Sequence, residues 1–260
     1  MTDRTDATAR ELKRQHEAGE TYRTLEGALK PVDIDEAYAA QFRLHQLHLE
    51  NGRGPLAGRK IALASKVQQE LCGVNHPIAG GVFKRDIHQS PATLRMADFN
   101  GPGLEFEMAA VLSEGVSPGE GPFDAQSIRA KVKSLHPAFE MIIDRHADYS
   151  KIEATTMVAD NCWCAGVILG PEIENWRDLD LDDLPCELLW NDEPPVHARS
   201  GDAGPLDKLA WIATELARRG QSLNPGDVVI TGSVIRTRAP KAGDHVRYRI
   251  AGYETSVKMV

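Results

Sequence analysis

Apolar residues recur at helical spacing in the first fifty residues of the chain. One face of the segment 33–51 collects the positions Tyr38, Phe42, His45 and Leu49. Asp33 or Asp35 can cap the first turn of this segment, and the Asn51-Gly52 pair is typical of a helix end. A second amphipathic pattern covers residues 6–18. We therefore predict two N-terminal helices and expect them to serve packing or subunit contact.

Between residues 55 and 170 the helical pattern gives way to alternation and to short apolar runs, which indicate β-strands. The predicted strands cover residues 59–65, 104–112, 137–144 and 161–170. Ile128, Val132 and Leu135 stand at helical spacing, so a helix is predicted immediately before the third of these strands. The acidic, proline-containing passage 171–200 predicts loops and a surface hairpin.

The last sixty residues combine one helix with further strands. Helical spacing relates Leu206, Leu209, Ile212, Ala213 and Leu216. Gly220 stands where a helix C-cap belongs, and a strand is predicted over 228–233. Alternation from Val246 to Ile250, with Gly252 in the turn, predicts a terminal hairpin.

The order of these elements lacks a regular strand–helix–strand alternation. It favours a mixed α+β domain whose strands curl into a barrel-like roll or sandwich. We predict an N-terminal helical segment over 1–54 and a β-rich domain over 55–260.

Composition narrows the class of protein. Of 260 residues, 42% are hydrophobic and 26% are charged, as in ordinary globular proteins. No apolar run approaches the roughly 20 residues of a membrane span, and the polar N-terminus resembles neither a signal nor a transit peptide, so a cytoplasmic location is expected. The formal net charge of -8, with no basic cluster to offset it, argues against nucleic acid as a partner.

The four cysteines are too scattered for a disulfide framework. Cys162 and Cys164 flank Trp163 in a pattern that raises the possibility of metal or redox chemistry. No second cysteine pair lies nearby, so two reduced thiols packed in a strand are the favoured interpretation.

The stretch GLEFEMAAVL, residues 103–112, places two carboxylates in an otherwise apolar strand. Side chains at i and i+2 of a strand share a face, so Glu105 and Glu107 point together while Phe106 points the other way. Two such charges repel unless a cation joins them or one is protonated. Glu140 is a third carboxylate in an apolar strand, and three oxygen ligands on adjacent strands would suit Mg²⁺ or Mn²⁺. The alternative is that the pair lies on a solvated face of an edge strand.

Six motifs in order resemble the fumarylacetoacetate hydrolase superfamily. They are GRKIALASK, LEFEMAAVL, PAFEMIIDR, ADNCWCAGVILG, LNPGDVVITGS and PKAGDHVRYRIAGYETSVKMV, which span roughly residues 55–260. The branch that they resemble contains 2-hydroxypenta-2,4-dienoate (2-oxopent-4-enoate) hydratases and 4-oxalocrotonate decarboxylases. The N-terminal helices also resemble those of the family.

The resemblance implies the fold of that superfamily and a site built on the three glutamates. Glu105, Glu107 and Glu140 match the family's metal ligands. Lys60 matches a lysine that lies beside the substrate and moves protons, although its residue context alone favours a surface lysine that ends a strand. The implied contacts to the substrate are made by the backbone around Leu63 to Ser65 and by Thr231, Gly232 and Ser233.

The implied chemistry is a lyase reaction through an enolate that a divalent cation stabilises. In a hydratase, ketonisation of the dienol gives an electrophilic alkene to which water adds at C4. In a decarboxylase, the same enolate forms by loss of CO₂. Next to a cation, the ammonium form of Lys60 would be disfavoured, so that this lysine could shuttle protons near neutral pH.

Several positions depart from the hydratase pattern in the walls of the implied pocket. Ile78 stands where those enzymes have an acid, and Trp163 and Cys164 stand where they have small hydroxyl residues. Arg236 and Arg238 replace small apolar residues. Arg236 is a candidate ligand for a second carboxylate on a longer substrate, the alternative being a solvated loop arginine. His76 could supply an acid–base group, although a structural or exposed role is favoured.

These residues and the resemblance lead to three hypotheses about function. The first is a metal-dependent hydratase of 2-hydroxy-2,4-dienoates or close 2-oxo acid analogues. The second, motivated by Ile78 and Arg236, is a decarboxylase or hydrolase of 2-oxo diacids in the same superfamily. The third is a non-catalytic partner in an oligomer, against which the retained glutamates and Lys60 argue. Members of the family form symmetric homo-oligomers, so a homo-oligomer is expected here.

Overall fold

The computed structural model describes residues 3–260, with Asp202 described by its backbone only. Its α-helices are α1 (Asp3–Glu17), α2 (Ile34–Glu50), α3 (Lys66–Leu71), α4 (Ala125–Ala130), α5 (Ala154–Ala159) and α6 (Pro205–Arg218). None of the helices in this part of the chain combines the length and apolar character that crossing a bilayer requires.

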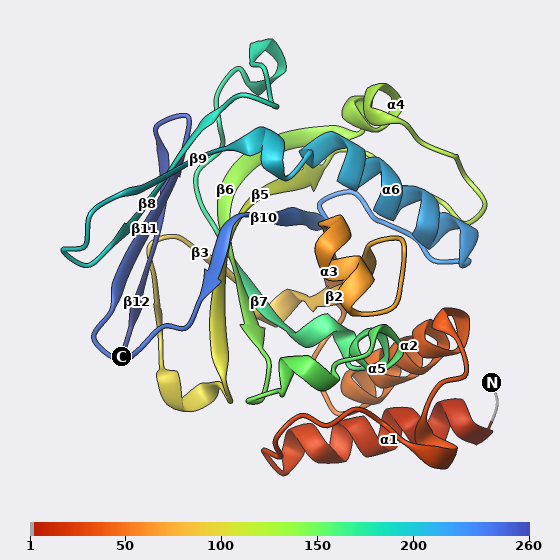
Figure 1. The fold of residues 1–260 in the computed structure, drawn as a ribbon. Helices are drawn as coiled ribbons and strands as arrows, with labels where there is room; N and C mark the ends of the chain where they lie inside the picture. The colour runs from red at the N-terminus through yellow and green to blue at the C-terminus, as the bar shows by residue number, and fades with distance from the viewer. Residues whose placement is uncertain (1–2) are drawn as a thin grey trace.

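Two mixed β-sheets form the body of the protein (Figure 1). The larger contains β2 (Ile78–Phe83), β1 (Leu56–Ala62), β10 (Val228–Arg238), β5 (Pro102–Leu112), β6 (Val132–Ile143), β7 (Cys164–Leu169) and β3 (Ile87–Gln89), in that spatial order. The smaller contains β4 (Ala92–Leu94), β12 (Tyr253–Met259), β11 (His245–Ile250), β8 (Pro185–Trp190) and β9 (Val196–Arg199). Each sheet keeps two edge strands, so the described strands form an open sandwich and the predicted barrel-like curling does not close.

An aromatic layer joins the two sheets. Phe106 of β5 and Phe139 of β6 pack edge to face with ring centroids 5.9 Å apart. Phe106 also contacts Trp190 and Tyr248 of the smaller sheet. Because side chains alternate along β5, burying Phe106 between the sheets turns its neighbours Glu105 and Glu107 to the opposite face of the larger sheet.

The predicted N-terminal helices are present and pack against each other and against α5, at the lower right of Figure 1. Asp33 caps α2 by accepting a hydrogen bond from the backbone N–H of Glu36, and Asn51 ends the helix. Gln41 ties α2 to the rest of the molecule, since its side-chain amide donates to the carbonyl oxygens of Ala79 and Val158. The predicted boundary at residues 54 and 55 falls in the connection between α2 and β1.

Three sequence predictions need correction. The helical pattern Ile128–Val132–Leu135 is realised only as far as the short helix α4, and Val132 and Leu135 lie in β6. The strand predicted over 59–65 ends at Ala62, because Leu63 turns to a left-handed φ of 53°. The strand predicted over 161–170 begins only at Cys164.

The remaining predictions of elements agree with the structure. The passage 171–200 contains the hairpin of β8 and β9, and the chain ends in the hairpin of β11 and β12. The helix α6 ends at Arg218, followed by Gly220 at a φ of 70°. The strand that starts at Val228 runs five residues beyond its predicted end at 233, to Arg238. The extension includes Arg236 and Thr237.

Candidate active site

Three carboxylates meet on one face of the larger sheet. β5 and β6 are antiparallel neighbours, and their register sets Glu105 directly opposite Glu140. Glu107 follows two residues after Glu105 and so shares its face. One carboxylate oxygen from each of the three glutamates lies within 4.8 Å of the others. Glu107 and Glu140 are fully buried and Glu105 is half-buried, so the solvated edge-strand alternative does not describe them.

The hydrogen bonds of this triad leave three of its buried oxygens without a donor. The hydroxyl of Thr237 donates to Oε1 of Glu105 at 2.6 Å, and the backbone N–H of Gly232 donates to Oε2 of Glu107 at 2.7 Å. Oε1 of Glu107 and both oxygens of Glu140 are buried without a hydrogen-bond partner among the described residues. Burying acceptors in this way is costly unless another group binds them.

Lys60 supplies a cation to the triad. Its side chain is buried on β1, and its Nζ lies 3.0 Å from Oε1 of Glu140, although not in the geometry of a hydrogen bond. Burial works against the charge of this lysine, but the carboxylates of Glu140 and Glu105 outweigh burial and raise its pKa above the usual range. The protein's own charges therefore hold Lys60 as an ammonium ion, whereas a divalent cation beside it would act in the opposite sense.

Burial also disturbs the carboxylates themselves. It raises the pKa of Glu107 to about 8, and the charge of Glu105 adds to the effect. The pKa of Glu140 is raised for the same first reason, with Lys60 opposing the shift. A cluster of buried oxygens that lack donors and resist ionisation fits a divalent cation, because hard cations bind carboxylate oxygens and would compensate their charge.

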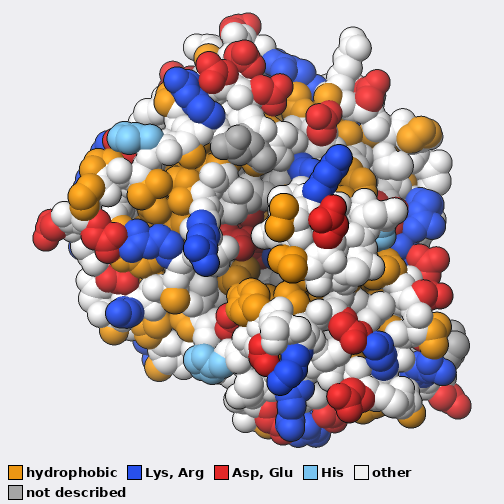
Figure 2. Space-filling model, in the orientation of Figure 1, with side chains coloured by type: hydrophobic (Ala, Val, Ile, Leu, Met, Phe, Trp, Pro, Cys, Tyr) orange, Lys and Arg blue, Asp and Glu red, His pale blue; other side chains and the backbone are white. Residues whose placement is uncertain are grey.

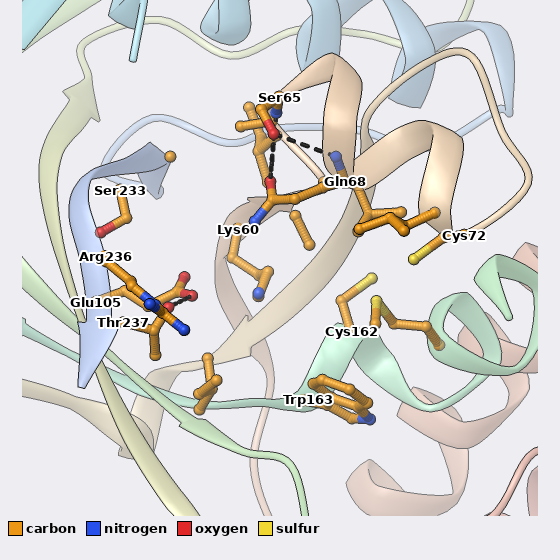
Figure 3. A pocket seen from close by; sticks show the side chains of 18 of the residues that line it. Lys60, Ser65, Gln68, Cys72, Glu105, Cys162, Trp163, Ser233, Arg236 and Thr237 are labelled. Atoms are coloured by element: carbon orange, nitrogen blue, oxygen red, sulfur yellow. Dashed lines mark hydrogen bonds between the residues drawn. The ribbon is translucent and has the colours of Figure 1, made fainter. Parts of the chain in front are cut away.

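A cavity of about 420 Å³ reaches Glu105 of the triad and Lys60, whereas Glu107 and Glu140 lie behind its wall and do not line it. Figure 2 shows the face of the molecule hollowed near its centre, with acidic atoms in the depth of the hollow. In Figure 3, Lys60 reaches in from β1, while Glu105, Arg236 and Thr237 stand on the opposite side and Trp163 lies below. Of the residues predicted to contact substrate, those that line the cavity are Lys60, Leu63, Ser65, Trp163, Gly232, Ser233 and Arg236.

Two predicted substrate contacts lie elsewhere. Ile78 is fully buried in β2, where it pairs with Ala62, and it is not part of the cavity wall. The hydroxyl of Thr231 donates to the carbonyl oxygen of Met108, so this side chain joins β10 to β5. His76 also stays outside the wall, with its Nδ1 2.7 Å from the carbonyl oxygen of Pro77.

A left-handed turn carries Trp163 to the cavity. Asn161, Cys162 and Trp163 have φ values of 54°, 51° and 61°, a conformation that costs side-chain-bearing residues free energy. Asn161 fixes this turn to β2, because its amide exchanges hydrogen bonds with both backbone groups of Gly81. The ring of His45 also binds Asn161, with Nε2 donating to Oδ1 of Asn161 at 2.7 Å. The hydrogen bonds of Asn161 with Gly81 and His45 are called the clamp of Asn161.

Cys162 and Cys164 form no disulfide, and all four cysteines are buried. Burial raises the pKa of Cys162 to about 12, so its thiol stays protonated near neutral pH. The described His, Cys, Asp and Glu side chains gather as a possible metal site only at the three glutamates. Cys162 and Cys164 are thus both buried, Cys162 in the turn and Cys164 at the start of β7.

Ion pairs beneath the turn stabilise its surroundings. Arg145 and Asp160 are buried and lie 2.5 Å apart, and His16 of α1 contacts the other oxygen of Asp160. Asp144 accepts hydrogen bonds from the backbone of His146 and the hydroxyl of Tyr149. Asp144, Arg145, Asp160 and Asn161 thus have structural, hydrogen-bonding roles around the turn.

Sequence reasoning missed Thr237, which orients Glu105, and Tyr149, which stacks edge to face on Trp163 with centroids 5.7 Å apart. Neither residue belongs to a recognisable motif. Thr237 reaches the site because β10 bulges: Ile235 pairs with Phe106 and Arg238 with Leu104, so three steps along β10 oppose two along β5.

Comparison with known proteins agrees with this arrangement. Residues 77–260 match the family described as fumarylacetoacetate (FAA) hydrolase, C-terminal. The chain is 30% identical over 254 residues to a 2-keto-4-pentenoate hydratase of Paraburkholderia phymatum, covering 96% of this chain and 95% of that protein. It is 29% identical over 250 residues to the enzyme of the same name from Paraburkholderia xenovorans, covering 95% and 91%. Its fold superposes with a TM-score of 0.89 on 4-oxalocrotonate decarboxylase from Pseudomonas putida G7 complexed with magnesium and adipate, at 20% identity, covering 100% of this chain and 99% of that one.

Proposed function

The chain belongs to the fumarylacetoacetate hydrolase family, and from that premise we propose that it is a divalent-metal-dependent hydratase. Its substrate would be a 2-hydroxy-2,4-dienoate or the corresponding 2-oxo-enoate, the class to which the names of its hydratase relatives point. The observation that carries the proposal is the triad of Glu105, Glu107 and Glu140, which leaves three buried oxygens without donors and places Glu105 in the wall of the same cavity as Lys60.

Glu105, Glu107 and Glu140 would hold Mg²⁺ or Mn²⁺. When bound, such a cation would supply positive charge that stabilises the enolate oxygen of a 2-oxo acid. Thr237 and Gly232 each fix one oxygen of Glu105 and Glu107, so these two carboxylates are held in place before any ligand arrives. The magnesium in the decarboxylase that shares the fold supports a hard divalent ion, and the choice between Mg²⁺ and Mn²⁺ is left to experiment.

Residues of the chain itself would transfer the protons and bind the substrate. Lys60 is the one lysine of the cavity wall described here and reaches its interior, so its Nζ can deliver a proton to carbon or remove one as dienol becomes ketone. The left-handed Leu63 and the backbone up to Ser65 line the same cavity, and the substrate carboxylate would bind to this segment. The apolar wall, which includes Trp163, would limit water to the molecule that adds at C4.

Decarboxylation of a 2-oxo diacid is the second candidate. It would use the same triad and the same enolate, and the observation in its favour is Arg236, a cation on the cavity wall suited to a second carboxylate. A non-catalytic role in an oligomer is disfavoured, because such a role gives no reason to keep buried carboxylates without donors.

The test is an assay of purified protein with 2-hydroxypenta-2,4-dienoate and with a 2-oxo diacid, in the presence of Mg²⁺ or Mn²⁺. Hydration appears as loss of the dienol's ultraviolet absorbance to a 4-hydroxy-2-oxo acid, and decarboxylation as release of CO₂. We expect hydration that a chelator abolishes and that either metal restores. Release of CO₂ without hydration of any dienol would replace the hydratase by the decarboxylase.

A matched pair of variants tests the site itself. Glu107→Gln removes one buried ligand, whereas Glu114→Gln changes an exposed glutamate on the loop after β5. Calorimetric titration with Mg²⁺ or Mn²⁺ should show binding to wild type and to Glu114→Gln, and binding weakened at least tenfold in Glu107→Gln. Failure of the wild type to bind either metal, even with oxalate present, would favour the non-catalytic role.

We also propose that the protein forms a homo-oligomer in the cytoplasm. Leu49, Val67 and Leu71 are exposed apolar side chains at more than half of their full accessibility, and subunit contact would cover such groups. Light scattering coupled to size-exclusion chromatography would give the number of subunits, and a monomeric mass at micromolar concentration would contradict this expectation.

A further inference from the structure

Arg236 is a cation on the cavity wall without a partner of its own. It lies in β10 and is exposed, and no carboxylate among the described side chains forms an ion pair or hydrogen bond with it. The other lining cation, Lys60, is already beside Glu140. Arg238, two residues along the strand, is paired with Glu193 at 2.8 Å and stacks on Trp190 at 4.3 Å. An arginine that serves only the fold would be expected to resemble Arg238.

The backbone directs this side chain to the cavity. In a regular strand, Arg236 and Thr237 would point to opposite faces. In the bulge between Ile235 and Arg238, the two residues Arg236 and Thr237 stand opposite the single residue Glu105 of β5, and both of them line the cavity. Figure 3 shows the guanidinium of Arg236 on the same side of the cavity as Glu105. The bulge that positions Thr237 on a metal ligand thus also brings in the unpaired cation.

The rest of the cavity wall indicates which kind of ligand could contact both the triad and Arg236. Besides these charged groups, the cavity wall contains apolar side chains, among them Ile142, Val234 and Ile235. A 2-oxo acid held at the triad would extend its carbon chain along these residues. The guanidinium would then meet the far end of the chain, where a planar fork of N–H donors matches a carboxylate.

We propose that Arg236 selects substrates that carry a second carboxylate, so that the chain acts on the dioate members of its substrate class in preference to simple dienoates. The inference rests on the proposed function for the position of the first carboxylate. It concerns specificity only, and hydration and decarboxylation remain to be separated by the assay above.

The test compares two 2-oxo acids of equal length, 2-oxohexanoate and 2-oxoadipate, which differ by the distal carboxylate. Their binding to the Mg²⁺-loaded protein is measured by titration calorimetry, a readout that needs no turnover. We expect wild type to bind 2-oxoadipate roughly 10- to 100-fold more tightly, because a charge-assisted hydrogen-bonded pair contributes on that scale. Arg236→Gln should reduce the affinity for 2-oxoadipate to that for 2-oxohexanoate and leave the latter unchanged.

Two further variants complete the design. Arg238→Gln removes the same charge from the same strand outside the cavity, and it should retain the preference for the diacid within about twofold. Arg236→Lys should keep part of the preference, since it retains the charge without the fork. Thermal unfolding of each variant with Mg²⁺ checks that the fold is intact.

The outcomes separate the two proposals. Equal binding of both acids by wild type, or an equal loss of both in Arg236→Gln, would overturn the role of Arg236 and leave the hydratase proposal standing. Preference for 2-oxoadipate that depends on Arg236, together with failure to hydrate any dienol, would sustain this inference while overturning the hydratase. Failure of both acids to bind the metal-loaded protein would overturn both.

Discussion

The Nζ of Lys60 lies 3.0 Å from Oε1 of Glu140, and both side chains are buried. The two residues are 80 positions apart in the sequence, on β1 and β6, strands that β10 and β5 separate in the sheet. Their contact spans the face of the sheet on which Glu105 and Glu107 also stand. It joins the proposed proton carrier to a proposed metal ligand, so that the charge of each depends on the other.

Replacing Lys60 by methionine should reduce turnover far more than it affects metal binding. We expect kcat to fall by about 10²- to 10⁴-fold, the usual contribution of a positioned general acid or base. Removing a cation from beside the triad should leave Mg²⁺ affinity unchanged or raise it. Steady-state kinetics and calorimetry measure the two effects, with Lys66→Met, an exposed lysine of α3, as the control. A fall in metal affinity equal to the fall in kcat would assign Lys60 to the structure of the site.

Glu107→Gln should stabilise the metal-free protein. Burial raises the pKa of Glu107 to about 8, above its value in an unfolded chain. The free energy of unfolding of the metal-free protein should therefore decrease as pH rises from about 4.5 to 8, because the unfolded chain loses this proton first. A neutral amide removes that cost, and its oxygen can keep the hydrogen bond from Gly232. We expect the free energy of unfolding at pH 8 without metal to increase by about 1–3 kcal/mol.

The same variant should lose the stabilisation that metal provides. Mg²⁺ at a hundredfold excess over its Kd would stabilise wild type by about 2.7 kcal/mol, and Glu107→Gln by much less. Chemical denaturation with and without Mg²⁺ at pH 6 and pH 8 measures both effects. Equal stabilisation of the two proteins by metal would contradict the assignment of Glu107 as a ligand.

His45 should make the protein acid-sensitive. Burial lowers its pKa to about 3, so the folded protein keeps the ring neutral while an unfolded chain protonates it near pH 6.5. The unfolded state therefore binds the extra proton, and stability should fall as pH decreases from about 6.5 towards 3.

His45→Gln should flatten this part of the stability curve, because glutamine does not titrate and can still donate to Asn161. Urea denaturation at pH 7 and at pH 5 measures the difference, and we expect wild type to lose about 1–2 kcal/mol more than the variant. His197→Gln, an exposed histidine of β9, serves as the control. Parallel curves for wild type and His45→Gln would contradict the prediction.

The clamp of Asn161 should be needed to hold the turn that carries Trp163. Asn161→Ala leaves both backbone groups of Gly81 and the ring of His45 without partners, and we expect a loss of about 2–4 kcal/mol. Asn161→Gly makes the same deletion but tolerates the φ of 54°. The difference between the two variants measures the backbone strain, which we expect at about 1 kcal/mol. Denaturation midpoints that match wild type in both variants would show that the clamp is dispensable.

Local pattern was sufficient for much of the fold. The caps of α2, the apolar face of α6 and the alternation of the last hairpin depend on neighbours within a few residues, and these elements appear as predicted. The errors arose where distant contacts decide. Val132 and Leu135 have helical spacing, yet pairing with β5 draws them into a strand.

For the site, the sequence by itself determined that Glu105 and Glu107 share a face, because strand alternation is a property of the backbone. It also indicated Glu140 as a third carboxylate in an apolar strand, and the family motifs added Lys60. Only the tertiary structure decided that Glu105 stands opposite Glu140, since the register of β5 and β6 depends on the whole sheet. It also moved Ile78 out of the cavity wall and, through the irregular pairing of β10 with β5, brought Thr237 into it beside Arg236, which the family motifs had already indicated. Side-chain spacing is fixed by local geometry, whereas partners across strands are fixed by the packing of segments far apart in the chain.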